Sequence, residues 1–127
     1  MAKVTNLKSI ANNTPYTMSV RNGENHSEQF SIAAGSAWNG SLWIPWIGKD
    51  SENYKAIQLL LGPRGDVTIW LFQDYWEPPN ANAIKYLIAP EMKYSGGTQE
   101  VDGNNRGGGE KILNVSSGTP SYLLKMI

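Results

Sequence analysis

Aromatic side chains are the residues of this chain with the clearest binding chemistry. Three of its five tryptophans, Trp38, Trp43 and Trp46, fall within nine residues, and a second aromatic stretch spans residues 70–76. The apolar face of a sugar ring stacks on indole or phenol rings, while carboxylates and amides bind its hydroxyl groups. Because large aromatic rings are mostly buried on average, the pattern predicts that some of these rings form the core and others contact a ligand.

Backbone-breaking residues decide which tryptophans we expect at the surface. Gly40 and Pro45 interrupt any regular ladder over residues 38–46, so we expect an edge or a loop here rather than a regular core strand. We expect Trp38 and Trp70 in the core. The aromatic candidates for ligand binding, with the carboxylate that follows a predicted central strand, are Trp43, Trp46, Asp74, Tyr75 and Trp76.

The glycine-rich stretch 102–110 offers a second group of polar side chains. It is not a phosphate-binding loop, because Gly109 and Glu110 occupy the places of the required Lys and Ser or Thr. It is not an EF-hand, because Arg106 and Leu113 occupy ligand positions. A dinucleotide-binding fingerprint would need a flanking βαβ unit, which the pattern lacks. The stretch is predicted to be either a solvated connection or a ligand-contacting loop that uses Asp102, Asn104, Asn105 and Arg106.

The residue types required for catalysis are sparse. The chain has no cysteine, and its one histidine, His26, lies in a polar run. A catalytic triad would need that histidine buried and oriented by a carboxylate, and a zinc site would need several His or Cys ligands. No pair among the eleven acidic residues stands out as a glycosidase pair. We therefore expect no enzymatic activity, no metal and no cofactor.

The charge balance restricts the expected partners. Eleven lysines and arginines are matched by eleven aspartates and glutamates. A neutral chain gives no reason to expect nucleic acid or a purely electrostatic attachment to anionic lipid. We therefore expect a neutral glycan or glycoconjugate, an uncharged lipid surface, or another copy of the chain in a homo-oligomer.

Length and apolar patterning predict one domain over residues 1–127. The N-terminus has no apolar run typical of a signal peptide, and the longest apolar runs are too short to span a membrane. The absence of cysteine fits a reducing compartment. We expect a cytoplasmic protein, or one released without a classical signal peptide.

Short alternating segments bounded by turn residues predict an all-β fold. Residues 54–61 and 67–72 form the clearest hairpin and are expected at the centre of a sheet. Asn22-Gly23 has the signature of a type I′ turn, with a return strand over 29–32. The other expected strands cover 4–10, 16–21, 83–89, 111–115 and 122–127, and residues 91–110 are expected to form a long loop. About eight short strands are typical of an antiparallel β-sandwich or a small barrel.

An all-β, cysteine-free chain of this size without a signal peptide resembles, in class, small microbial lectins and aegerolysin-type lipid-binding cytolysins. The first hypothesis is a non-catalytic, lectin-like carbohydrate-binding protein. The first alternative is a membrane-active, lipid-binding toxin whose aromatic rings lie at the lipid interface. The second alternative is an interaction module whose aromatic surface is an oligomer interface.

Overall fold

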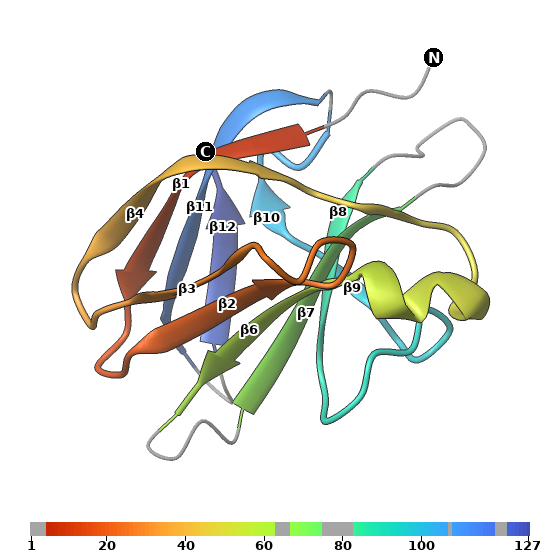
Figure 1. Ribbon diagram of the computed structural model, residues 1–127, viewed down its shortest axis with the longest axis horizontal. Helices are drawn as coiled ribbons and strands as arrows, with labels where there is room; N and C mark the ends of the chain where they lie inside the picture. The colour runs from red at the N-terminus through yellow and green to blue at the C-terminus, as the bar shows by residue number, and fades with distance from the viewer. Residues whose placement is uncertain (1–4, 63–66, 75–82, 107, 119–121) are drawn as a thin grey trace.

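The protein is built from two β-sheets, which confirms the predicted all-β class. A computed structural model describes residues 5–62, 67–74, 83–106, 108–118 and 122–127 (Figure 1). One sheet has the order β10-β12-β11-β1-β4, formed by β10 (Asp102–Gly103), β12 (Tyr122–Met126), β11 (Gly109–Ser117), β1 (Thr5–Asn13) and β4 (Ala37–Trp43). We refer to it as the five-stranded sheet.

The second sheet carries most of the middle of the chain. Its order is β3-β2-β6-β7-β8-β9, formed by β3 (Gln29–Ile32), β2 (Met18–Asn22), β6 (Ile57–Leu61), β7 (Val67–Asp74), β8 (Ile84–Ile88) and β9 (Gln99–Glu100). A seventh strand, β5 (Trp46–Ile47), pairs with β7, and a short 3₁₀ helix, η1 (Asp50–Lys55), follows it. We refer to it as the seven-stranded sheet.

The two sheets share one hydrophobic core. Leu7 and Ile10 of β1 and Leu59 of β6 are fully buried in the same cluster of side chains. Alternation places Leu59 on the buried face of β6, since every second residue of a strand points to the same face. Leu7 and Ile10 are three residues apart and both face the core because a register shift between Leu7 and Ser9 interrupts the alternation of β1. The buried face of β6 was therefore predictable from local alternation, whereas that of β1 was not.

Three strand pairs are parallel, which corrects the expectation of an antiparallel fold. They are β1 with β11, β10 with β12, and β5 with β7. Parallel neighbours need a long connection between them, and the chain between β1 and β11 builds the entire seven-stranded sheet. Twelve strands are described rather than about eight, because the tryptophan stretch forms β4 and three further strands, β5, β9 and β10, have two residues each.

The predicted central hairpin is confirmed. β6 and β7 pair antiparallel, with Leu59 opposite Ile69, and both strands lie in the middle of the seven-stranded sheet. Residues 54 and 55 are not part of the strand, however. They are the last two residues of η1. The sequence did not predict this helix, because its six residues make less than two turns of an α-helix and show no helical period.

The return strand over residues 29–32 is confirmed, but the type I′ turn is wrong. β2 and β3 are joined by residues 23–28, with Arg21 opposite Gln29. A Cβ atom on Gly23 would overlap the carbonyl oxygen of Tyr54 and lie 2.7 Å from that of Ala56. Glycine is therefore needed here for a close approach of two backbones, not for a tight turn.

The tryptophan stretch forms an edge strand with an irregular ladder at Gly40, which agrees with the expectation of an edge or a loop. β4 pairs with β1, and the register shift between them absorbs Gly40 and Ser41. Trp38 is half-buried rather than central, and its ring stacks on Phe30 at 4.4 Å between centroids. Figure 1 shows the chain then crossing the molecule from β4 to η1.

The expected long loop over 91–110 is partly wrong. Val101 is fully buried in the shared core, and its backbone N–H donates to the carbonyl of Ile84 at 2.9 Å. This contact lies between the two short strands β9 and β10, so the segment belongs to the sheets at its centre. No helix in the described part of the chain is long and apolar enough to cross a membrane.

Leu59→Ala and Leu60→Ala test the two faces of β6. Leu59 is fully buried, and we expect its truncation to lower the free energy of unfolding by about 2–5 kcal/mol. The adjacent Leu60 points away from the core and is half-buried, so its truncation should lower that energy by about 1 kcal/mol. Urea denaturation monitored by circular dichroism measures both, and equal losses would contradict the assignment of faces.

Candidate functional site

The outer face of the seven-stranded sheet is covered over only part of its area. Phe72 points outward from β7, yet it is fully buried with Ile47 and Ala56 in a second cluster. Met92 and Tyr94 pack against this cluster from the segment after β8. β5, η1 and residues 89–97 therefore form a cover over one end of the sheet.

The buried carboxylate of Asp74 links this cover to the sheet. Asp74 is 7% exposed, and it accepts a hydrogen bond from the hydroxyl of Tyr94 at 2.6 Å. Lys85 Nζ of β8 lies 2.7 Å from the other oxygen of Asp74. Burial, followed by the hydrogen bond to the Asp74 carboxylate, raises the pKa of Tyr94 to about 12. The neutral phenol is thus the form that the folded protein favours.

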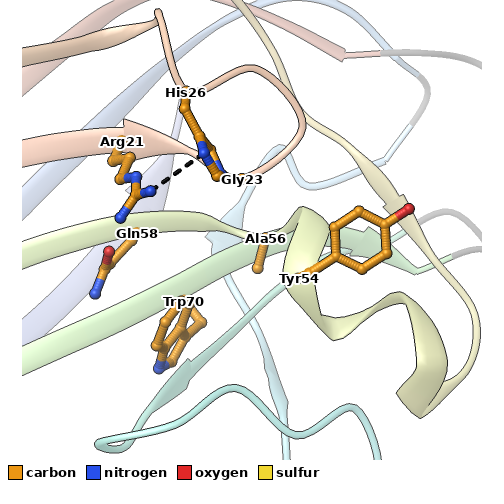
Figure 2. A pocket seen from close by; sticks show the side chains of 7 residues that line it. All are labelled: Arg21, Gly23, His26, Tyr54, Ala56, Gln58 and Trp70. Carbon is orange, nitrogen blue, oxygen red and sulfur yellow. Dashed lines mark hydrogen bonds between the residues drawn. The ribbon is translucent and has the colours of Figure 1, made fainter.

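A pocket lies at the boundary where this cover ends and the sheet face becomes open. Arg21, Gln58 and Trp70 occupy one row across β2, β6 and β7, because Arg21 pairs with Gln58 and Gln58 with Trp70. Their side chains point away from the shared core. They line a cavity of about 190 Å³ (Figure 2).

Two segments from outside the row complete the pocket. His26 comes from the β2–β3 connection and lies above Arg21, while Tyr54 of η1 stands on the opposite side (Figure 2). Tyr54 is 68% exposed, so its ring is available at the rim. Trp70 is half-buried, and its indole N–H donates to the carbonyl of Ala89 at 2.9 Å, which fixes the ring. The pocket therefore has one fixed aromatic wall, Trp70, and an exposed tyrosine at its rim whose ring extends outward (Figure 2).

The polar side of the pocket has a defined hydrogen-bond direction. Arg21 Nη2 and His26 Nδ1 are 3.2 Å apart. A guanidinium has donors only, so His26 Nδ1 accepts this bond and its proton is on Nε2. Gln58 adds an amide that both donates and accepts. This arrangement can bind the hydroxyl groups of a polar ligand while a ring packs on Trp70.

The structure does not bring the tryptophans and loop residues predicted from the sequence into one surface. Trp43 is 54% exposed at the end of β4, one edge of the five-stranded sheet, whereas residues 102–103 form its opposite edge. Trp46 is half-buried on β5 in the other sheet, and Asp74 is engaged by Tyr94 and Lys85. Tyr75 and Trp76 lie outside the described residues.

The polar residues of the 102–106 segment have different surroundings. Asp102 and Asn104 are exposed, and the backbone N–H of Asn104 donates to the carbonyl of Met126 at 2.8 Å. Asn105 Nδ2 donates to the carbonyl of Val101 at 2.6 Å, and Arg106 pairs with Glu100 at 3.0 Å. The side chains of Asn105 and Arg106 thus hold the segment in place. Ligand contact by the four side chains stays a prediction.

The pocket residues were missed because they come from three separate segments. Strand alternation places Arg21 outward, and it could have placed Gln58 and Trp70 outward as well. No local pattern indicates that His26 and Tyr54 approach this row. Trp70 was expected in the core, and its half-buried ring instead serves the second cluster and the pocket wall.

Comparison of the chain with known proteins found no match. No family model matches it, and neither a curated protein nor a solved structure does. Over the described ranges, no three His, Asp or Glu side chains are grouped closely enough to hold a metal ion. The function must therefore be argued from the pocket itself.

Tyr94 should make the stability of the protein depend on alkaline pH. Its pKa of about 12 in the folded protein exceeds the ordinary value of 10.0, so the unfolded chain ionises first. The stabilisation is complete below about pH 10 and is lost as the pH rises toward about 12. Urea unfolding at several pH values should show a steeper alkaline loss for the native protein than for Tyr94→Phe, and parallel losses would refute this origin.

Gly23→Ala tests the close approach that shapes the pocket. The added methyl group would overlap the carbonyl oxygen of Tyr54, so the β2–β3 connection must move and its hydrogen bond to Ala56 must weaken. We expect the free energy of unfolding to fall by about 1–3 kcal/mol. The neighbouring Glu24→Ala, at an exposed position, should change it by less than about 0.5 kcal/mol. Equal effects in thermal unfolding would show that the approach is unimportant.

Proposed function

We propose that this protein is a non-catalytic carbohydrate-binding protein and that the pocket on the seven-stranded sheet is its sugar site. The observation that carries the proposal is that the fixed ring of Trp70 and the exposed Tyr54 line one pocket together with the polar groups of Arg21, Gln58 and His26. Stacking of a sugar on an aromatic ring uses the apolar C–H face, and side-chain amides and cations satisfy its hydroxyl groups.

The size of the pocket supports a small ligand unit. Its volume of about 190 Å³ is below the range of about 300–1,000 Å³ of pockets that enclose drug-sized molecules. A single sugar ring, with the rest of a glycan extending into solvent, fits this size. The open side of the sheet next to the pocket leaves room for that extension.

The architecture and the lining agree with binding rather than hydrolysis. Two sheets that face each other across one core support the proposal of a β-sandwich, although fold alone does not decide function. Neither aspartate nor glutamate lines the pocket, whereas most glycoside hydrolases need two carboxylates beside the scissile bond. The proposal is therefore of a lectin-like protein.

Tyr54→Ala and Trp43→Ala form a matched pair, since both remove an exposed aromatic ring, one from η1 beside the pocket and the other from the end of β4 in the five-stranded sheet. On a glycan array followed by calorimetry, Tyr54→Ala should weaken binding of the best glycan about tenfold, which corresponds to 1.4 kcal/mol. Trp43→Ala should leave that affinity unchanged. The reverse result would move the site to the tryptophan stretch.

Two further measurements distinguish the alternatives. Sedimentation with phosphatidylcholine liposomes that sugar does not compete away would favour a lipid-binding, cytolysin-type protein. Light scattering that shows an oligomer lost in Trp43→Ala would favour an interaction module. Absence of binding across broad glycan classes would end the carbohydrate proposal.

A further inference from the structure

Arg21 is the charged group of the pocket, and no carboxylate neutralises it among the residues described. The ion pairs of that part of the chain join Lys55 to Glu52, Lys85 to Asp74, and Arg106 to Glu100. One N–H of Arg21 is used by His26, whereas a guanidinium carries five. No other hydrogen bond from the Arg21 side chain is found among the described residues, and this side chain lines the pocket.

Arg21 is the one formally charged side chain among the described residues that line the pocket, although the whole chain is neutral. Arg21 and His26 are joined in the lining by Gln58, Tyr54 and Trp70, none of which is a carboxylate. The nearby Glu28 accepts a hydrogen bond from Asn22 at 2.8 Å and does not line the pocket. At short range an unpaired charge outweighs the net charge of the molecule, because opposite charges elsewhere are screened within about 8–10 Å.

The hydrogen bond to His26 also orients the guanidinium. It engages one edge of the planar group through Nη2, which leaves Nη1 and the other hydrogen of Nη2 for a ligand. Two parallel N–H groups match the two oxygens of a carboxylate, and such bidentate pairs are shorter and stronger than neutral hydrogen bonds. A lysine at this position would offer only a point charge.

We infer that the sugar bound here carries a carboxylate, as uronic and sialic acids do. The inference rests on the proposed function and specifies its ligand class. The carboxylate pairs with Arg21, the sugar ring packs on Trp70, and Gln58 binds a hydroxyl group. The expectation of a neutral glycan, which came from the net charge of the chain, is thereby refined to an acidic one.

The test compares acidic sugars with neutral counterparts of the same shape. Calorimetry is performed with oligogalacturonate and its carboxyl-reduced form, and with sialyllactose and lactose. We expect the acidic member of at least one pair to bind at least tenfold more tightly, with an affinity that falls as salt is raised. The pair that responds identifies whether the carboxylate comes from an internal uronate or from a terminal sialic acid.

Variants of Arg21 test whether the preference for acidic sugars depends on this side chain. Arg21→Gln should abolish the acid preference, and Arg21→Lys should retain a smaller one because it keeps charge without the planar fork. Lys125→Gln is the control, since it removes an exposed positive charge from β12 of the five-stranded sheet. It should keep the full preference. Circular dichroism establishes that each variant is folded.

The outcomes separate this inference from the function on which it rests. Equal binding of acidic and reduced sugars, or an acid preference that survives in Arg21→Gln, would overturn the inference and leave carbohydrate binding intact. Tighter binding of a sulfated galactan than of either carboxylated sugar would overturn the assignment of a carboxylate. Absence of binding to every sugar would overturn both proposals.

Discussion

Burial of β7 on both faces is the constraint on which the rest of the structure depends. Ile69 and Leu71 face the shared core, while Phe72 on the opposite face is equally buried. A strand that is apolar on both faces must be covered twice. The second cover is supplied by β5, η1 and residues 89–97, and Asp74 at the end of the same strand fastens it through Tyr94.

The position of the tryptophan stretch follows from the same need to cover both faces of β7. After β4 the chain leaves the five-stranded sheet and crosses to the outer face of the other sheet, where Pro45 accepts a hydrogen bond from the backbone of Gln73 at 2.8 Å. Trp38 stacks on Phe30, and Trp46 lies on β5. Trp38 therefore lies in β4 before the crossing, Trp43 stands exposed at its start, and Trp46 lies at its end.

Net charge and local charge give different expectations for the ligand. Equal numbers of acidic and basic residues suggest a neutral partner, and that reasoning holds for long-range attraction. The net charge of the chain does not show that Arg21 bonds to His26 in a pocket that no carboxylate lines. Short-range recognition depends on which charges are paired, and pairing is a property of the fold.

The sequence by itself determined the features that depend on near neighbours. Strand alternation predicted the buried faces of β2 and β8. The turn-forming residues in the sequence between 61 and 67 predicted the central hairpin. Both patterns act within a few residues. Only the tertiary structure decided the parallel pairing of β1 with β11 and the pocket formed by Arg21, Tyr54 and Trp70. Such contacts join segments tens of residues apart, and patterns that act within a few residues do not specify which distant segments meet.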